Sequence, residues 1–286
     1  MDNKIGIIWF RQDLRLNDNL ALDTLNRKYK EIVPIYILDN KVDIGRTSKW
    51  WLSQSLLKLD LALKKINSKI FFFKGNPDEI LKKIIDENNI GAVYWNRLYD
   101  SYSINRDRLI KKNLIDKNID AQSFNGSLLL EPWKVKNKSG DFFKVFTPFW
   151  KTSIELFDQF KIIKKPAKLN TPEIFIDIKL SLNQLDLFPK QKNWIKKISK
   201  YWNPGEEEAI KTLEIFIRKR INEYATGRDR PDKINTSMLS PYLHFGEISP
   251  VRVYIKINSI SVSANENVKK FLSEIGWREF SYNLLY

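Results

Sequence analysis

The amino-acid sequence predicts an α/β domain followed by an all-helical part. Over the first 130 residues, short apolar runs rich in β-branched and aromatic residues alternate with segments of helical spacing. After Pro204 every periodic segment is helical, and a chain of 286 residues is long enough for two domains. Strand–helix alternation implies right-handed crossovers, so we expect a doubly wound, Rossmann-like parallel sheet with helices on both faces.

Five strands are expected in the α/β domain: Ile5–Phe10, Ile32–Leu38, Ile70–Phe73, Ala92–Trp95 and Ile119–Phe124. Between the second and third of them, Trp51, Leu52, Leu56 and Leu59 recur at helical spacing. Pro77 is expected to begin the next helix, because its missing N–H costs nothing at the first helical position.

The chain between the two parts has weaker signals. The stretch from Leu128 to Trp150 contains aromatic and glycine-containing pieces that predict a loop and a hairpin. Residues 161–200 are rich in lysine, contain prolines and show no sustained periodicity, which is typical of a surface connection. We therefore divide the chain into an α/β domain (1–130), an inter-domain connection (131–200) and a helical domain (201–286).

In the helical domain, Gly205 precedes three glutamates, which favour the first turn of a helix because of the helix dipole. Gly227 is expected to end the apolar stripe that follows. Ser240 and Ser249 each precede a proline and are predicted N-caps. The last helix, Phe271 to Leu285, is apolar on most sides and is expected to be buried.

Composition excludes several classes of protein. The excess of 49 Lys+Arg over 34 Asp+Glu gives a net charge of +15, which favours a polyanionic partner such as nucleic acid. The absence of cysteine excludes disulfides, thiolate nucleophiles and zinc fingers, and His244 is the single histidine. The longest apolar run, Ile32–Leu38, is too short for a membrane span, and Met1–Phe10 lacks a signal-peptide layout. We expect a cytoplasmic protein with no metal and no membrane partner.

Two loops are candidate ligand sites. Arg11–Arg15 follows the first strand, at the edge of the sheet where α/β proteins bind ligands, although a salt-bridged structural loop is the favoured interpretation. Thr236–Pro241 gathers three hydroxyls at the start of a helix, which suits a phosphate or pyrophosphate. Simple N-capping by Ser240 explains the same pattern without a ligand and is favoured on the pattern alone.

The last helix offers a third candidate. Glu274 and Arg278 are four residues apart with Trp277 beside them, so the three side chains can share one side. One interpretation is a buried ion pair next to a core tryptophan. The other is a pocket lining in which the indole stacks a base and the carboxylate hydrogen-bonds its edge.

Five motifs resemble, in order, the signatures of the DNA photolyase/cryptochrome family. They are Trp9–Arg15 with Asp18-Asn19, Val145–Phe149, Trp202–Glu206, Thr236–Pro241 and Trp277–Phe280. Together they extend over the whole chain, which makes the resemblance far more specific than any one motif. It implies an α/β antenna domain followed by a helical FAD-binding domain, in agreement with the two parts expected from periodicity.

The resemblance implies light-dependent repair of UV-damaged DNA. The implied activity is that of a deoxyribodipyrimidine photo-lyase, a carbon–carbon lyase in which reduced FAD donates an electron to a cyclobutane pyrimidine dimer. The chain is most similar to a bacterial class I enzyme of this kind, and the glutamate at 274 favours cyclobutane dimers over (6-4) lesions. The alternative is a cryptochrome-like flavin photoreceptor or signalling protein without repair activity, and a third possibility is a degenerate protein with no activity.

Roles are carried over by motif. Glu274 resembles the catalytic carboxylate that hydrogen-bonds the lesion, and Trp277 resembles the indole that packs against the flipped pyrimidines. Arg228, Trp277 and Arg278 are the expected DNA contacts. The expected FAD contacts are Tyr224, Thr236, Ser237, Met238, Leu239, Ser240, Phe271 and Glu274, with Phe271 standing where many members carry a flavin-side tryptophan.

Two departures from the family pattern change the expectations. Tyr102 and Ser103 stand where folate-type members have an Asn–Glu pair, so the antenna pigment, of folate or deazaflavin type, stays open. The chain stops at Tyr286, before the end of the family's flavin domain. We therefore expect a fragment or truncated product that alone neither retains FAD stoichiometrically nor repairs DNA, and a monomer in the complete form.

Overall fold

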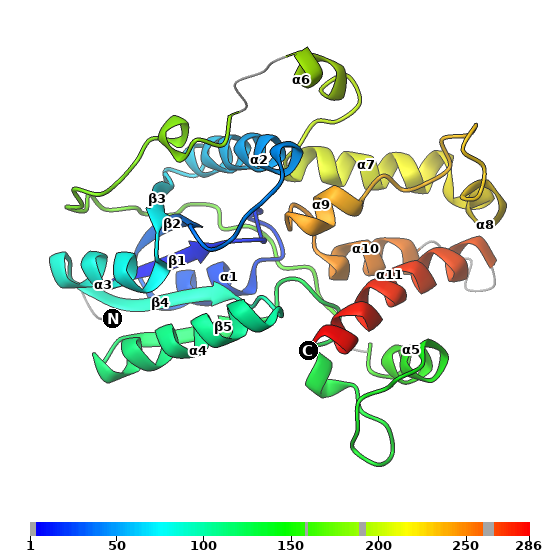
Figure 1. Cartoon of the computed structure of the whole chain (residues 1–286), viewed down its shortest axis with the longest axis horizontal. Helices are drawn as coiled ribbons and strands as arrows, with labels where there is room; N and C mark the ends of the chain where they lie inside the picture. The colour runs from blue at the N-terminus through cyan, green and yellow to red at the C-terminus, as the bar shows by residue number, and fades with distance from the viewer. Residues whose placement is uncertain (1–3, 158–159, 189–192, 260–265) are drawn as a thin grey trace.

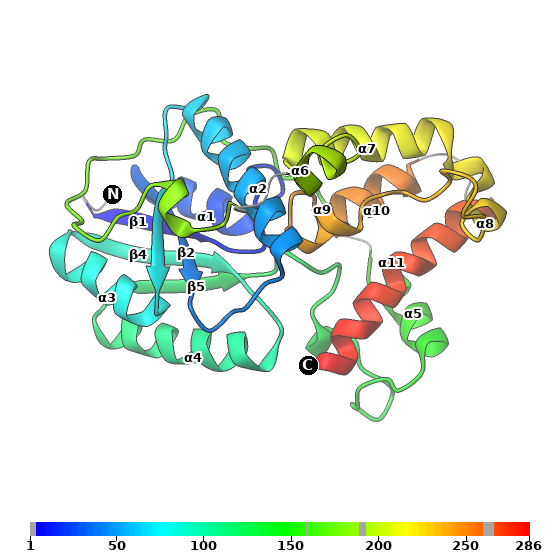
Figure 2. The same cartoon turned by 45° about the horizontal axis from the view of Figure 1, so that its top comes forward.

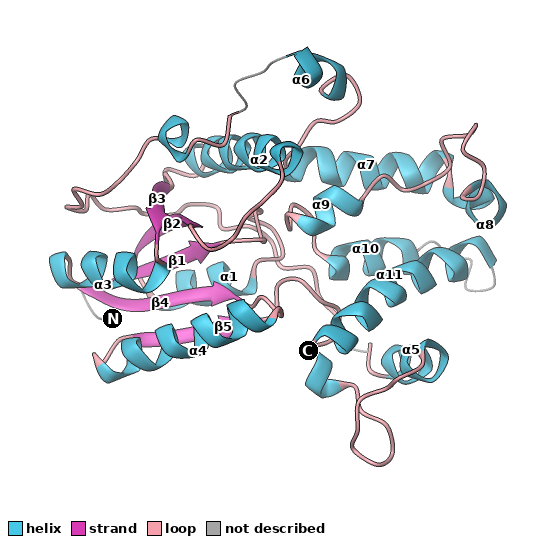
Figure 3. Cartoon of the chain, in the orientation of Figure 1, coloured by secondary structure: helices cyan, strands magenta, loops and turns pink. Residues whose placement is uncertain are grey.

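Two parts lie side by side in the computed structural model, which describes residues 4–157, 160–188, 193–259 and 266–286 (Figure 1). The N-terminal part contains a parallel sheet covered by helices, whereas the C-terminal part is helical throughout (Figure 3). The predicted fold class is therefore confirmed.

A five-stranded parallel sheet, in the order β3-β2-β1-β4-β5, forms the centre of the N-terminal part. Its strands are β1 (Ile5–Phe10), β2 (Glu31–Asp39), β3 (Phe71–Gly75), β4 (Ile90–Asn96) and β5 (Asp120–Phe124). The covering helices are α1 (Leu20–Lys28), α2 (Arg46–Lys64), α3 (Pro77–Glu87) and α4 (Ser101–Asp116). Successive side chains of a strand point to opposite faces, so Ile8 and Phe10 pack with α1 and α2, while Ile7 and Trp9 pack with α3 and α4.

The C-terminal part lies against the N-terminal part (Figure 2), and its core residues join a buried cluster of the sheet. Its helices are α5 (Phe146–Glu155), α6 (Asn193–Ile198), α7 (Glu206–Lys219), α8 (Tyr224–Gly227), α9 (Ser240–His244), α10 (Pro250–Asn258) and α11 (Glu266–Leu285). Short 3-10 turns lie at η1 (Pro132–Lys134), η2 (Leu182–Leu185) and η3 (Ile221–Glu223). Phe216, Val253 and Phe271 belong to the same buried cluster as Ile8 and Phe10. Among the described residues, no helix is long and apolar enough to cross a membrane.

Several helix starts follow the local sequence. Pro77 begins α3 and the acids at 206–208 occupy the first turn of α7, as predicted. Ser249 caps α10 because its Oγ accepts the N–H of Arg252 at 2.9 Å. The predicted N-cap at Ser240 is wrong: Leu239 occupies the cap position and Ser240 is already the first helical residue.

Two further local predictions need correction. Gly227 does end a helix, but that helix is the short α8, because the backbone at Arg220 leaves helical geometry and closes α7 with its apolar stripe at Lys219. Between Leu128 and Trp150 there is no strand hairpin, although the N–H of Asn137 donates to the carbonyl of Asp141 in a turn. The aromatic residues that suggested a strand belong instead to α5, which packs against α11.

The segment 160–188 lies along the α/β domain and is partly buried by it. The N–H of Leu180 donates to the carbonyl of Phe72 at 2.8 Å, which adds an antiparallel bridge beside β3. Ile174 and Ile176 are buried with the residues of α3. The segment is thus more than a surface connection, and the division at 130 and 200 stays a prediction.

Candidate functional site

Helix α11 carries an exposed tryptophan. Trp277 is 46% exposed, and its ring stacks on Phe146 of α5 with centroids 3.9 Å apart and planes 10° apart. α11 lies so close to α5 that a side chain on Gly276 would overlap the ring of Trp150. The interpretation of Trp277 as a core residue is therefore wrong, and the indole is held from behind while nearly half of its surface stays available.

Glu274 pairs with a different arginine from the one expected. Its carboxylate forms an ion pair with Arg228, which follows α8, and lies 3.9 Å from the ammonium of Lys270. The hydrogen bond with Glu274 is the main cause that raises the pKa of Arg228. The expected Glu274–Arg278 pair is wrong, because Arg278 turns to Glu279 at 2.9 Å and lies over the ring of Tyr282.

An aromatic cluster packs beside the ion pair of Glu274 and Arg228. Phe271 is 3% exposed and packs against Phe216 and Tyr224, with ring centroids 4.6 and 5.2 Å away. The guanidinium of Arg228 lies 5.6 Å from the centre of the Tyr224 ring. The structure thus brings Tyr224, Arg228, Phe271 and Glu274 together, as expected for parts of one site.

The hydroxyl-rich segment follows a loop anchored on α7 and α8. Arg220 donates to the carbonyl of Thr236, and Gly227 lacks a side chain exactly where Asn235 packs. Thr236 and Ser240 are exposed, Met238 has a left-handed backbone (φ 59°), and Leu239 is buried. The Oγ of Ser237 accepts the N–H of Leu239. Thr236 and Ser240 are therefore exposed, and neither hydroxyl caps α9.

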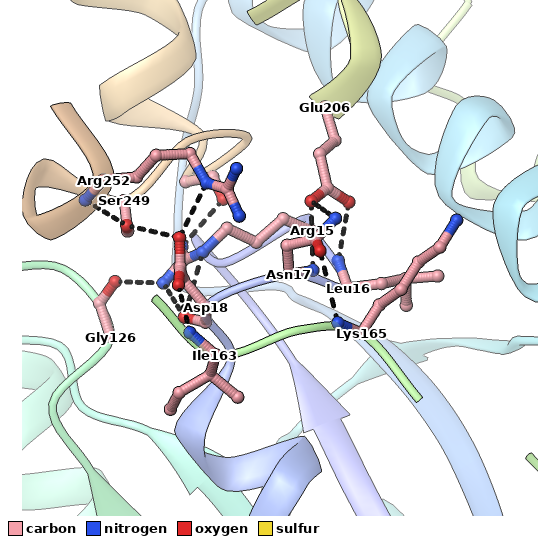
Figure 4. A network of polar contacts seen from close by, with 11 residues as sticks. Arg15, Leu16, Asn17, Asp18, Gly126, Ile163, Lys165, Glu206, Ser249 and Arg252 are labelled. Carbon is pink, nitrogen blue, oxygen red and sulfur yellow. Dashed lines mark hydrogen bonds and ion pairs between the residues drawn. The ribbon is translucent and has the colours of Figure 1, made fainter. Parts of the chain in front are cut away.

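The loop after β1 is a joint between the two parts of the chain, drawn in Figure 4. The guanidinium of Arg15, 2% exposed, donates to the carbonyls of Asp18, Gly126 and Gly246 at 2.7–2.9 Å. Burial lowers the pKa of Arg15, and the charges of Asp13 and Asp18 oppose that shift. These contacts connect β1, the chain after β5 and the loop between α9 and α10.

Two carboxylates complete the joint. Asp18 accepts from the side chains of Arg252 and Ser249 at 2.8 and 3.2 Å and from the N–H of Ile163 at 2.7 Å. Glu206, at the start of α7, accepts the N–H groups of Leu16 and Asn17. The interpretation of this loop as a salt-bridged structural element agrees with these contacts.

With this geometry in place, the chain can be compared with known proteins. The model of the DNA photolyase family matches residues 6–170, which is more than half of the chain. The chain belongs to the DNA photolyase family.

Relatives of this family member cover almost its full length. It is 36% identical to a deoxyribodipyrimidine photo-lyase of Agrobacterium fabrum over 98% of the chain and 59% of the relative, and 32% identical to cryptochrome-2 of Arabidopsis thaliana over 98% and 48%. A crystal structure described as a bacterial class III photolyase from Agrobacterium tumefaciens superposes with a TM-score of 0.95 at 36% identity, over 100% of this chain and 59% of that one. The chain thus spans about half to three fifths of these relatives. The family prediction is confirmed, while the class named for the superposed structure is III and not the expected class I.

Two buried glutamates of this photolyase-family chain were not predicted from the sequence. Glu247 is fully buried and accepts from Ser55 Oγ at 2.6 Å and Trp51 Nε1 at 3.0 Å, which connects the α9–α10 loop to α2. Glu279 is 5% exposed and accepts from the backbone of Leu129. A usable signal existed only for Glu279, because it is a charged residue on the apolar stripe of α11.

The chain's stability is expected to fall as the pH rises through the neutral range. Burial raises the pKa of both Glu247 and Glu279 from 4.5 to about 7, so the folded protein binds these two protons more tightly than the unfolded chain. Their contribution is complete below pH 4.5 and is lost as the pH rises to about 7, on the order of 3 kcal/mol for each group. Urea denaturation at pH 5.5 to 8 measures it.

Glu247→Gln isolates one of the two groups. The variant should lose the part of the pH dependence that Glu247 contributes, while Glu279 and His244, whose pKa is lowered by desolvation, still titrate. Glu214→Gln on the exposed side of α7 should keep the wild-type slope. An unchanged slope in Glu247→Gln would show that its carboxyl is not protonated in the folded protein near neutral pH.

The pair that departs from the folate-type pattern has its own contacts at the carboxyl edge of the sheet. Tyr102 donates to Asp39 at 2.7 Å, and Arg106 donates to the same carboxylate at 3.1 Å. Ser103 is buried in the first turn of α4. Asp39 and Arg106 line a pocket together with Trp9 and His244 at the end of β1 and β2. In the described part of the chain, no group of three acidic or histidine side chains is placed to hold a metal ion.

Proposed function

We propose that this chain acts in the light-dependent repair of cyclobutane pyrimidine dimers in DNA, with reduced FAD as the electron donor. The observation that carries the proposal is the outer surface of α11 with its neighbour Arg228. There an indole that is 46% exposed lies less than one helical turn from a carboxylate paired with an arginine. These are the groups that stack a base, hydrogen-bond its edge and contact a phosphate.

The residues present fit a bound FAD. Exposed hydroxyls at Thr236 and Ser240 are neutral donors suited to phosphate oxygens, and Tyr224 and Phe271 offer apolar ring surface beside Arg228. Reduced FAD held there would supply the electron for opening the cyclobutane ring. We assign Tyr224, Phe271 and the segment 236–240 to holding the cofactor.

The chain's own side chains bind and orient the lesion in this proposal. Trp277 stacks on the pyrimidine pair, because its ring is already fixed in orientation by Phe146. Glu274, held in place by its pairing with Arg228, offers carboxylate oxygens that accept a hydrogen bond from a pyrimidine N–H. Arg228 and Arg278 add contacts to phosphates, which makes the binding dependent on salt.

Removal of the Trp277 ring tests the proposal. In the native protein, Trp277→Ala should weaken binding to DNA with one thymine dimer by about 1–3 kcal/mol, about 5- to 150-fold, and lower the repair per absorbed photon. Binding to the same duplex without the dimer should change less than about 2-fold, because phosphate contacts carry it. Fluorescence anisotropy with the two duplexes, and dimer loss under illumination and in the dark, measure both effects.

Tyr201→Ala is a matched control, since Tyr201 is 79% exposed and follows α6, a helix that lies apart from α11 (Figure 1). It should leave both affinities unchanged. Equal losses on damaged and undamaged DNA for Trp277→Ala would refute the stacking role.

A cryptochrome-like photoreceptor is the second candidate function, favoured by the 32% identity to cryptochrome-2 of Arabidopsis thaliana along 98% of this chain. The same experiment separates the two. Flavin-dependent light absorption without any dimer loss under illumination would support the photoreceptor and contradict repair.

A further inference from the structure

Glu279 is a buried carboxylate on the side of α11 opposite Trp277. Residues two positions apart in an α-helix point in directions that differ by about 200°. The side of α11 that buries Glu279 therefore determines where Trp277 points. Glu279 is 5% exposed, while Trp277 is 46% exposed. In this turn of α11, the side with Glu279 is buried and the side with Trp277 is exposed.

The two carboxylate oxygens of Glu279 have different partners. Oε2 accepts the N–H of Leu129 at 2.7 Å and the N–H of Leu130 at 3.3 Å, and Oε1 accepts from Arg278 at 2.9 Å. Burying a carboxyl group is costly unless its hydrogen bonds are made, so the contacts with the backbone of Leu129 and Leu130 allow only a narrow range of helix rotation.

The segment 129–130, which donates to Glu279, is fixed by hydrogen bonds of the residue that follows it. The next residue, Glu131, is buried and accepts from Arg97 at 2.5 Å and from the hydroxyl of Tyr99 at 3.1 Å, and both of these follow β4. The backbone of Leu129 and Leu130 is therefore fixed relative to the carboxyl edge of the sheet. The hydrogen bonds of Glu279 therefore fix α11 relative to this edge of the sheet.

We propose that Glu279 is a positioning residue, which fixes the rotation of α11 against the backbone of 129–130 and thereby presents Trp277 and Glu274 outward. The part of this proposal that concerns DNA rests on the proposed repair function. The part that concerns the helix does not, and it can be measured without DNA.

Two substitutions of Glu279 distinguish the contacts of its two carboxylate oxygens. In Glu279→Gln the carboxamide oxygen can still accept both backbone N–H groups, while its NH₂ replaces the acceptor for Arg278. In Glu279→Ala both contacts are lost. Asn283→Ala is the matched control, because Asn283 is 4% exposed on the same helix and donates to the carbonyl of Phe143 at 3.0 Å, away from the 129–130 backbone.

Hydrogen exchange and near-UV circular dichroism of the native protein report on the helix directly. In Glu279→Ala we expect the amides of Leu129 and Leu130 to exchange about 10-fold faster, as for the loss of one buried hydrogen bond. The dichroism band of Trp277, identified from its loss in Trp277→Phe, should also change. Glu279→Gln should stay within about 2-fold of wild type in exchange and keep the band, and Asn283→Ala should leave both signals unchanged even if its melting temperature falls.

Binding to DNA gives the second readout. The preference of Glu279→Ala for dimer-containing over undamaged duplex should fall by about the same factor as in Trp277→Ala, about 5-fold or more, and Glu279→Gln should restore it. Wild-type amide exchange and an unchanged Trp277 band in Glu279→Ala would overturn the proposal, whatever the loss of stability. Altered exchange and band in Glu279→Ala, with no lesion preference in wild type or Trp277→Ala, would uphold the positioning role and refute the repair function.

Discussion

Gly246→Ala is expected to lower the free energy of unfolding by about 2–5 kcal/mol, from overpacking and from left-handed backbone strain. Gly246 has φ +66°, and a Cβ there would overlap the carbonyl oxygen of Gln12 and the Cα of Asp13. Both are backbone atoms of the loop after β1, so no side chain can move away to make room. Chemical denaturation followed by far-UV circular dichroism measures the loss.

Gly140→Ala is the control for backbone strain alone. Gly140 also has positive φ, +82°, but nothing lies within 4 Å of the position of a Cβ. This variant should lose only about 1–2 kcal/mol. Equal losses in the two variants would mean that the α9–α10 loop can move away from the loop after β1 at little cost.

Arg15→Ala is expected to destabilise the protein by about 3–5 kcal/mol, the range for removing one partner from a buried ionic group. The change leaves the carbonyls of Gly126 and Gly246 without their donor and removes one buried cation from beside Asp13 and Asp18, although Asp18 keeps its ion pair with Arg252. Because these groups come from both parts of the chain, the helical part should also become easier to cleave by protease. Denaturation and limited proteolysis measure the two effects.

Arg27→Ala is the matched control, since the side chain of Arg27 is 77% exposed and pairs with Asp23 on the same helix. A surface ion pair contributes about 0–1 kcal/mol, so this variant should remain close to wild type. If Arg15→Ala were as stable as Arg27→Ala, the joint in Figure 4 would not hold the two parts together.

The pattern of strands and helices could be predicted from the sequence because it depends on local periodicity. The run Ile5–Phe10 is apolar on both sides since β1 is covered by helices on both faces, and this strand has the predicted bounds. Pro77 and Ser249 acted as predicted because the first turn of a helix depends on its own few residues. The order of the family motifs was also readable without a structure.

The partners of the site residues could not be predicted in this way. Spacing of four residues made Glu274 and Arg278 possible partners, but the fold supplied Arg228 to one and Glu279 to the other. The stretch Leu128–Trp150 suggested a loop and a hairpin, but its residues 146–150 belong to a helix that supports Trp277 through contacts with the distant α11.

By itself, the sequence determined the α/β and helical parts and the family, since these follow from local periodicity and ordered motifs, while the roles of the site residues stay a prediction. Only the tertiary structure decided that Trp277 is exposed, that the loop after β1 is a joint, and that Glu247 and Glu279 are buried acceptors. Burial and hydrogen-bond partners depend on which distant segments meet. Leu129 and Glu279 are 150 residues apart along the chain, and no local pattern records their contact.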